Sequence, residues 1–230
     1  MKIKNLVYSL VAIMLVAITF SSCQPPESSA SVDQDRIYCV YELFYNQNTD
    51  ITKARATFRF GNALGTPLFL AKKSEVSCDG ELMSKILDEW TLYEAEFVGR
   101  KDSATFKWVD VDQNEFNNKI HMVELAYQDS VTVIPRNAAY ELFWDGNALI
   151  AGESVALFID AAGNASQTFV VNQLGVQSII LAKNKLELLP EGTATLYMDR
   201  FYEIDLQEAT SAGGTIFSKY RPENKTVMLK

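Results

Sequence analysis

The chain has 230 residues, with 29 acidic and 21 basic side chains and a formal net charge of −8. Hydrophobic residues make up 48% and aromatic residues 11%, so there is enough apolar material for a core and wholesale disorder is excluded. The acidic balance argues against nucleic acid as a partner, because a phosphate backbone is bound by clustered Lys and Arg. The single His excludes any site that needs two imidazoles.

The N-terminus has the layout of a targeting signal. A basic start with two Lys, an apolar run over 6–20 and two Ser come directly before Cys23. The run suits a signal peptide and is shorter than the roughly 20 residues of a membrane span. The segment resembles a bacterial lipoprotein signal, although Phe20 stands where that family usually has Leu, Val or Ile. The alternative is an ordinary secretory signal with a chance Cys.

The resemblance implies that residues 1–22 are removed and that Cys23 becomes a lipidated first residue that anchors the protein to the membrane. Residues 23–35 carry Pro, Ser and acids without an apolar period, so we expect a flexible tether. Gln24 stands where an Asp would resemble an inner-membrane retention signal, which favours the outer membrane. The side of that membrane on which the protein lies stays open.

Three short segments recur in the same order, which indicates a duplicated domain. They are 41–44 with 140–143, 91–93 with 195–197, and 132–134 with 226–228. We therefore expect two domains, over 36–131 and 136–230, with Pro135 in the linker.

Most of each half alternates apolar and polar residues with a period of two, which is typical of strands. Turn residues fall at about 8–12 residue spacing, as in an antiparallel β-sandwich. One stretch, 80–90, has helical spacing. The layout resembles the tandem immunoglobulin-like modules of bacterial surface lipoproteins, without the antibody Cys…Trp…Cys signature. The fold class we predict is all-β, with two tandem antiparallel immunoglobulin-like sandwiches.

Two cysteines remain after Cys23, and both lie in the first predicted domain. Cys39 and Cys78 are an even pair in a compartment that permits disulfides, and a bridge would close a loop of about 40 residues. The alternative is two buried free thiols. A catalytic thiol is disfavoured, because nothing basic flanks either Cys.

Two polar features could hold a metal ion or act in acid–base chemistry. Asp110, Asp112 and Asn114 have the spacing of a calcium loop, but the places where an EF-hand needs Gly and Glu hold Glu115 and His121. We favour a polar hairpin turn and assign no metal site. His121 alternates with apolar residues, which favours a structural role.

Aromatic residues beside polar turns suggest a sugar site, because aromatic faces stack on sugar rings. Trp144 and Tyr45 occupy matching places in the repeat, each followed by polar side chains. The candidate glycan-binding residues are Tyr45, Asn46, Asn48, Trp144, Asp145 and Asn147. The alternative is that both rings cap a core.

These observations favour a lipid-anchored, non-catalytic envelope protein that binds or scaffolds an unidentified envelope protein. The runner-up is glycan capture through Trp144 and Tyr45, and a small envelope hydrolase comes third. No nucleotide loop, serine-nucleophile motif or zinc spacing occurs in the sequence, and we assign no cofactor.

Overall fold

The computed structural model describes residues 25–87 and 91–230. The expected signal peptide and Cys23 lie outside these residues. Within the described ranges, no helix is long and apolar enough to cross a membrane.

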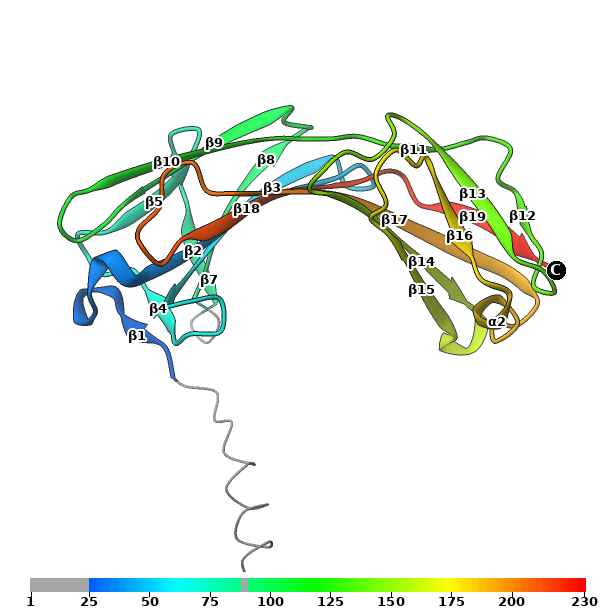
Figure 1. Cartoon of the computed structure of the whole chain (residues 1–230), viewed down its shortest axis with the longest axis horizontal. Helices are drawn as coiled ribbons and strands as arrows, with labels where there is room; N and C mark the ends of the chain where they lie inside the picture. The colour runs from blue at the N-terminus through cyan, green and yellow to red at the C-terminus, as the bar shows by residue number, and fades with distance from the viewer. Residues whose placement is uncertain (1–24, 88–90) are drawn as a thin grey trace, which may run out of the picture.

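Two β-sandwiches follow one another along an arch (Figure 1). We call lobe 1 the sandwich whose core begins at Ile37 and lobe 2 the sandwich whose core runs from Leu125 to Leu229. The prediction of an all-β fold with two tandem β-sandwiches is confirmed. The strands of the first part of the chain are β1 (Glu27–Ser28), β2 (Ile37–Asn46), β3 (Ile51–Phe60), β4 (Pro67–Phe69), β5 (Glu75–Cys78), β6 (Glu81–Leu82), β7 (Ser84–Leu87), β8 (Leu92–Val98), β9 (Ser103–Val109) and β10 (Glu115–His121).

Lobe 2 and the connections complete the element list. The strands of the second part of the chain are β11 (Ala126–Tyr127), β12 (Val133–Ile134), β13 (Tyr140–Asp145), β14 (Glu153–Ala161), β15 (Ser166–Val171), β16 (Ser178–Leu181), β17 (Gly192–Asp205), β18 (Gly214–Arg221) and β19 (Lys225–Leu229). The short helices are three 3₁₀ turns, Ser29–Ser31, Gln34–Arg36 and Ala162–Asn164, and α2 (Lys183–Leu186).

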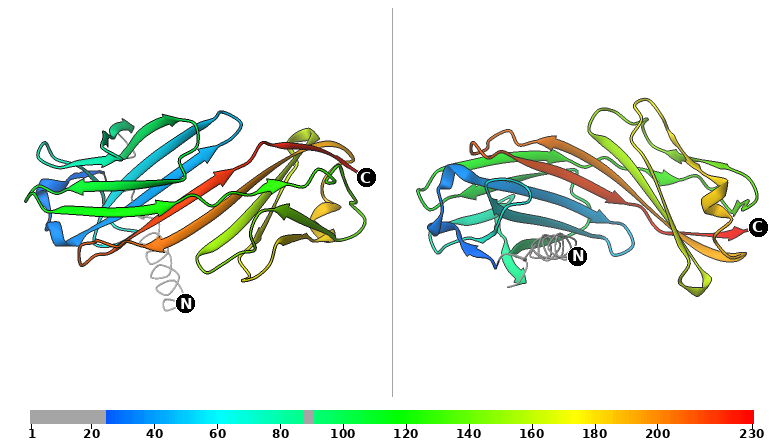
Figure 2. Two further views of the ribbon diagram at one scale, coloured as in Figure 1. Left: turned by 90° about the horizontal axis from the view of Figure 1, so that it is seen from above. Right: turned by 60° about the horizontal axis from the view of Figure 1, so that its bottom comes forward.

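One twelve-stranded sheet of the described residues runs through both lobes and lines the concave side of the arch (Figures 1 and 2). Its main path is β1-β4-β3-β2-β18-β17-β14-β15. A four-stranded sheet (β10-β9-β5-β6) covers it in lobe 1, and a three-stranded sheet (β11-β13-β16) covers it in lobe 2. Strict alternation of buried and half-buried residues along β2 and β9 places one face of each strand in the core.

The sheet is continuous because β17 is 14 residues long and serves both lobes. Its first part pairs with β14 and β19, and its last part pairs with β18, which runs parallel to β2 over eight residue pairs. We call residues 199–221 the crossing hairpin. It delivers Ile216 into the core of lobe 1. A Cβ on Gly214 would lie 2.2 Å from the carbonyl oxygen of Cys39, so only Gly permits this approach.

Three expectations from the sequence need correction. Residues 27–36 are not a free tether, because β1 pairs with β4 and Ser29 and Gln34 are buried. The stretch from residue 81 to 87 forms β6 and β7 rather than a helix. The crossing hairpin belongs by packing to lobe 1, although it falls within the predicted second domain.

The three pairs of recurring sequence segments do not lie on equivalent strands. The 41–44 segment lies on β2, between β3 and β18, whereas 140–143 lies on β13, between β11 and β16. The two segments of the third pair, 132–134 and 226–228, both lie in lobe 2, where Val133 pairs with Met228. The two lobes share a sandwich plan, but these matches do not give the register of a repeat.

Candidate functional site

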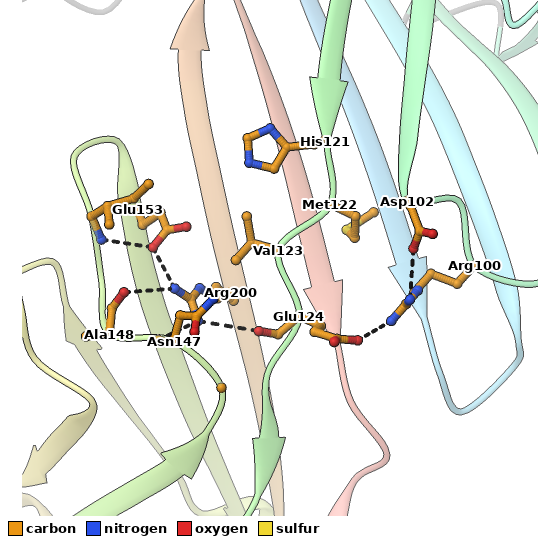
Figure 3. A pocket seen from close by; sticks show the side chains of 12 residues that line it. Arg100, Asp102, His121, Met122, Val123, Glu124, Asn147, Ala148, Glu153 and Arg200 are labelled. Carbon is orange, nitrogen blue, oxygen red and sulfur yellow. Dashed lines mark hydrogen bonds and ion pairs between the residues drawn. The ribbon is translucent and has the colours of Figure 1, made fainter.

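A groove of about 520 Å³ lies where the chain passes from β10 to β11, at the junction of the lobes (Figure 3). We call it the junction groove. Its wall toward lobe 1 carries Arg100, Asp102 and His121, and its floor carries Glu153 and Arg200. The remaining lining residues are Met122, Val123, Glu124, Gly146, Asn147, Ala148 and Ile150.

The floor of the junction groove is a buried ion pair. Arg200 projects from the face of β17 that carries the core residues Leu196 and Met198, and its side chain is 1% exposed. Its Nη2 lies 2.6 Å from Oε2 of Glu153 at the start of β14. That oxygen also accepts a hydrogen bond from the backbone N–H of Ile150. The ion pair therefore fixes the loop before β14 against β17.

The same guanidinium holds the connection between the lobes. Arg200 donates to the backbone carbonyls of Asn147 at 2.9 Å and of Glu124 and Ala148 at 3.4 Å. Glu124 lies in the segment that links β10 to β11. The Nε of Arg200 is buried without a hydrogen-bond partner among the described residues. Arg200 thus joins the lobe linker, the 146–150 loop and the shared strand at one point (Figure 3).

The rim of the junction groove is charged and exposed. Arg100 forms an ion pair with Asp102 at 2.8 Å and another with Glu124. His121 is exposed, and its ring centroid lies 4.5 Å from that of Tyr202 on the crossing hairpin. The expected apolar surroundings of His121 are corrected, since the side chain is exposed at the rim of the groove, whereas its expected structural role stays a prediction.

The predicted sugar-stacking residues do not present their faces to solvent. Trp144 is 0% exposed in the core of lobe 2, where its Nε1–H donates to the carbonyl of Asn147 at 3.3 Å. Tyr45 is 6% exposed, and its hydroxyl donates to Asp50. Trp144 and Leu142 share the inward face of β13, which leaves Phe143 outside. The glycan prediction based on these two rings is therefore wrong.

The polar neighbours of the two rings have structural roles. The side chain of Asn48 bonds to Asn46, to the carbonyl of Pro222 and to the N–H of Asn224. These bonds tie the β2–β3 turn to the chain that leaves β18. Asp145 is exposed, and of the six candidates only Asn147 lines the junction groove.

Cys39 and Cys78 are free thiols, so the possible disulfide is not formed. Both are buried in the core of lobe 1, Cys39 on β2 and Cys78 on β5 of the facing sheet. Burial raises the pKa of the Cys39 thiol far above its usual value, and burial raises the pKa of Cys78 to about 12. Neither thiol is therefore available as a nucleophile at neutral pH.

The calcium-like spacing forms the turn between β9 and β10, as expected. The Asp110 carboxylate is buried and accepts hydrogen bonds from the backbone N–H groups of Asp112 and Asn114, both at 2.8 Å. Its second oxygen accepts from the Asn114 side chain. Among the described residues, no group of three acidic, Cys or His side chains could hold a metal ion.

The concave face of the shared sheet carries a second ordered set of side chains. Phe44 lies opposite Lys219 in the strand register, and Lys219 lies opposite Phe201. The Lys219 ammonium lies 4.4 Å from the Phe44 ring centroid and 5.6 Å from that of Phe201. These contacts cross from β2 through β18 to β17, so they support the pairing between the lobes.

An ion network extends this face in lobe 1. Glu94 on β8 accepts from Arg55 at 2.7 Å and from Lys53 at 3.1 Å. Burial opposes ionisation of Glu94, but the hydrogen bonds from Arg55 and Lys53 outweigh it and lower the pKa of the carboxyl.

No sequence motif singled out Arg200, Glu153 or Arg100 as site residues. Arg200 follows an alternating apolar pattern on β17 and occupies a position where the alternation itself predicts a core residue. A charged residue at such a position is the one available clue, because buried charges need partners.

Comparisons with known proteins give fold-level likeness only. No protein-family model matches the chain, and the search of curated proteins gives no match. Among solved structures, a tetra-tandem repeat from the extending region of a large adhesion protein is 12% identical, with a TM-score of 0.27 over 83% of this chain and 49% of that chain. A Bacteroides ovatus protein, SGBP-B of a mixed-linkage glucan utilization locus, solved with a mixed-linkage heptasaccharide, is 10% identical, with a TM-score of 0.24 over 78% and 53% of the two chains.

Fibronectin(III)-like modules of Clostridium thermocellum CbhA are also similar, at 12% identity and a TM-score of 0.24, over 80% of this chain and 94% of theirs. The chain spans about half the length of the adhesion-protein and SGBP-B chains. These similar structures are adhesin, glycan-binding and fibronectin-like modules. The scores are too low to carry an argument about a ligand, so the site must be argued from its own residues.

Proposed function

We propose that the protein is a lipid-anchored, non-catalytic binding or scaffold protein of the cell envelope, held at the outer membrane through Cys23. We further propose that the junction groove receives a protein partner. The observation that carries this proposal is the buried Arg200–Glu153 pair, which fixes the lobe linker and the 146–150 loop on one shared strand. A groove fixed in this way binds with a smaller loss of conformational freedom.

The chemistry of the groove supports binding rather than catalysis. Each of its carboxylates is bonded to an arginine, since Glu153 pairs with Arg200, and Asp102 and Glu124 pair with Arg100. A general acid or base must instead reach the substrate with a proton to exchange. Exposed Ile150 beside the charged rim has the mixed apolar and polar character of a protein interface.

Site-specific photocrosslinking in intact cells tests the proposal. A photoreactive side chain at Asn147 replaces only the exposed amide and leaves in place the backbone carbonyl that Trp144 and Arg200 use. The matched control is Leu188, which is 67% exposed in lobe 2 and does not line the groove. We expect one discrete adduct from position 147 that weakens with Arg100→Glu, and none from 188. Equal adducts from both positions, or none from 147, would contradict the proposal.

A further inference from the structure

The first described strand, β1, lies only a few residues after the proposed lipid site. Glu27 pairs with Leu68 and Ser28 with Phe69, in parallel register. Ser29 is buried, and its hydroxyl accepts a hydrogen bond from the N–H of Ala71 at 2.9 Å. The side chain of Gln34 donates to the carbonyl of Ser29 at 2.6 Å. Residues 27–34 are therefore fastened to lobe 1.

This attachment limits how far lobe 1 can stand from the bilayer. Four residue steps separate Cys23 from Glu27. A fully extended chain covers at most about 3.6 Å per residue, so the two Cα atoms lie within roughly 14 Å of each other. If Cys23 carries lipid, as the proposed function requires, the β1 end of lobe 1 lies close to the lipid headgroups.

The surface at this end is apolar at its tip. Because β1 is parallel to β4, Glu27 lies at the same end of the pair as Pro67 and the 61–66 loop that precedes it. Leu64 in that loop is 94% exposed. Ile86 on β7 is exposed at the same end of the sheet, because β7 pairs there with the start of β8. Figure 1 shows β1, β4 and β7 together on the lower side of lobe 1.

Cationic side chains lie over aromatic rings around this tip. The Arg36 guanidinium lies 4.8 Å from the centroid of the Phe60 ring, next to the loop. The Lys85 ammonium lies 5.4 Å from the centroid of Phe69 on β4. Long cationic side chains with apolar stems and exposed leucines are what the boundary between headgroups and acyl chains accommodates.

We propose that Leu64, Ile86, Arg36 and Lys85 form a base on which lobe 1 rests against the bilayer that holds Cys23. The inference rests on the proposed lipid anchor and adds an orientation to it. The base lies at the concave side of the arch, and the linker that borders the junction groove crosses on the convex side (Figure 1). The groove then faces away from the lipid, toward a partner.

Lobe 1 offers a matched position at the opposite end of the same strand. Val98 is 93% exposed and pairs with Ile51 at the start of β3, whereas Leu64 follows Phe60 at its end. The strand is ten residues long, which is roughly 30 Å. The two side chains are both aliphatic and equally exposed, and they differ in their distance from the tether.

The experiment uses the full lipidated protein in phosphatidylcholine vesicles that contain lipids with a spin-labelled acyl chain. Leu64→Cys and Val98→Cys each receive an environment-sensitive fluorophore, while buried Cys39 and Cys78 stay unlabelled. We expect the label at 64 to be quenched several-fold more than the label at 98, with a blue-shifted emission. Equal quenching at the two positions would overturn the proposed base.

Flotation of the vesicles separates this inference from the anchor on which it rests. Protein that floats with the vesicles but shows equal quenching at both positions retains its anchor and lacks the base. Protein that fails to float has no anchor, which overturns the proposed function and the base together. A variant with Leu64→Glu, whose charge opposes burial in lipid, should float normally and reduce the quenching of a label at Ile86→Cys.

Discussion

The two lobes differ in how they complete their cores. Lobe 2 builds its core from residues of one continuous stretch, between Leu125 and Leu229. Lobe 1 takes Ile216 from the crossing hairpin and packs Tyr202, Ile204 and Leu206 against its core. In its sheet, β18 lies between β2 and β17. Lobe 1 therefore depends on the last part of the chain, whereas the core of lobe 2 does not depend on the first part.

This difference has a consequence for folding and for rigidity. Lobe 1 can close its sheet only after the crossing hairpin has been made, because β2 otherwise presents an unpaired edge. Once the hairpin has formed, three chain segments connect the two lobes. They are the 122–125 linker, β17 and the chain after β18. Folding of lobe 1 is thus coupled to that of lobe 2, and the finished arch presents a fixed groove at its junction.

The largest expected effect comes from cutting the chain at the linker. We expect the segment 125–230 to fold alone, and the segment 24–124 to stay unfolded until the other segment is added. Circular dichroism and the dispersion of amide resonances measure both outcomes. Cooperative folding of 24–124 by itself would contradict the dependence of lobe 1 on the hairpin.

Arg200→Ala tests how much the buried ion pair at the junction of the lobes contributes to stability. The change leaves Glu153 buried without its partner, so we expect a loss of about 3–5 kcal/mol in the free energy of unfolding, measured with urea. The double variant Arg200→Met with Glu153→Leu should recover much of that loss, because no buried charge remains. Lys107→Ala, which breaks the exposed pair with Glu115, should cost less than about 1 kcal/mol. A cost for Arg200→Ala as small as that of Lys107→Ala would contradict the role of the ion pair.

Ile216→Ala tests the hairpin's contribution to the core of lobe 1. Ile216 is 0% exposed, and truncation of a buried Ile costs about 2–5 kcal/mol. Thr215 lies next to Ile216 on the outer face of β18. Thr215→Ala should therefore lower the free energy of unfolding by less than about 1 kcal/mol. Urea unfolding of the two variants measures the difference. Similar small losses for both would show that lobe 1 does not need the hairpin.

Glu94 gives a pH test within lobe 1 that leaves the hairpin untouched. Its folded pKa lies below the usual 4.5, so its contribution to stability is complete above that value and is lost as the pH falls through the folded pKa. The stability gap between wild type and Glu94→Gln should be constant above about pH 5.5 and shrink below pH 4.5. Unfolding at a series of pH values measures the gap. A gap that does not change with pH would contradict the network with Arg55 and Lys53.

The smallest expected effect concerns the reactivity of the two buried thiols of lobe 1. With Cys23 blocked, Cys39 and Cys78 should both resist a maleimide in the native protein at pH 7 and react after unfolding, since each thiol is buried with a raised pKa. Cys39 lies opposite Gly214 of the crossing hairpin, so Ile216→Ala should speed its reaction more than that of Cys78. Fast native reaction of either thiol would contradict its burial.

The fold class was readable from the sequence because period-two alternation and turn spacing are local properties. The alternation on β13 also marks the buried face, because Tyr140, Leu142 and Trp144 share one phase while Phe143 shares the other with two acidic residues. The sugar site was expected because Trp144 adjoins a polar turn, and that reasoning set aside the phase that places its ring in the core. The buried indole is satisfied by the carbonyl of Asn147, a bond that no sequence pattern reports.

The junction groove could not be predicted for a different reason. Its parts come from β14, β17 and the linker, and they meet only because β17 continues past lobe 2 to pair with β18. Arg200 stands where alternation predicts an apolar residue, and its partner Glu153 lies 47 residues earlier in the chain. Long-range pairing of this kind is tertiary information, and propensity and periodicity do not contain it.

The most direct test of the account is the membrane attachment of Cys23→Ser, because the anchor underlies both the proposed function and the proposed base. Cells that express the wild type or the variant are labelled with a fatty acid and separated into membrane and soluble fractions. We expect the wild type in the membrane fraction with label, and Cys23→Ser in the soluble fraction without it. Unchanged labelling and sedimentation of Cys23→Ser would contradict the lipid anchor.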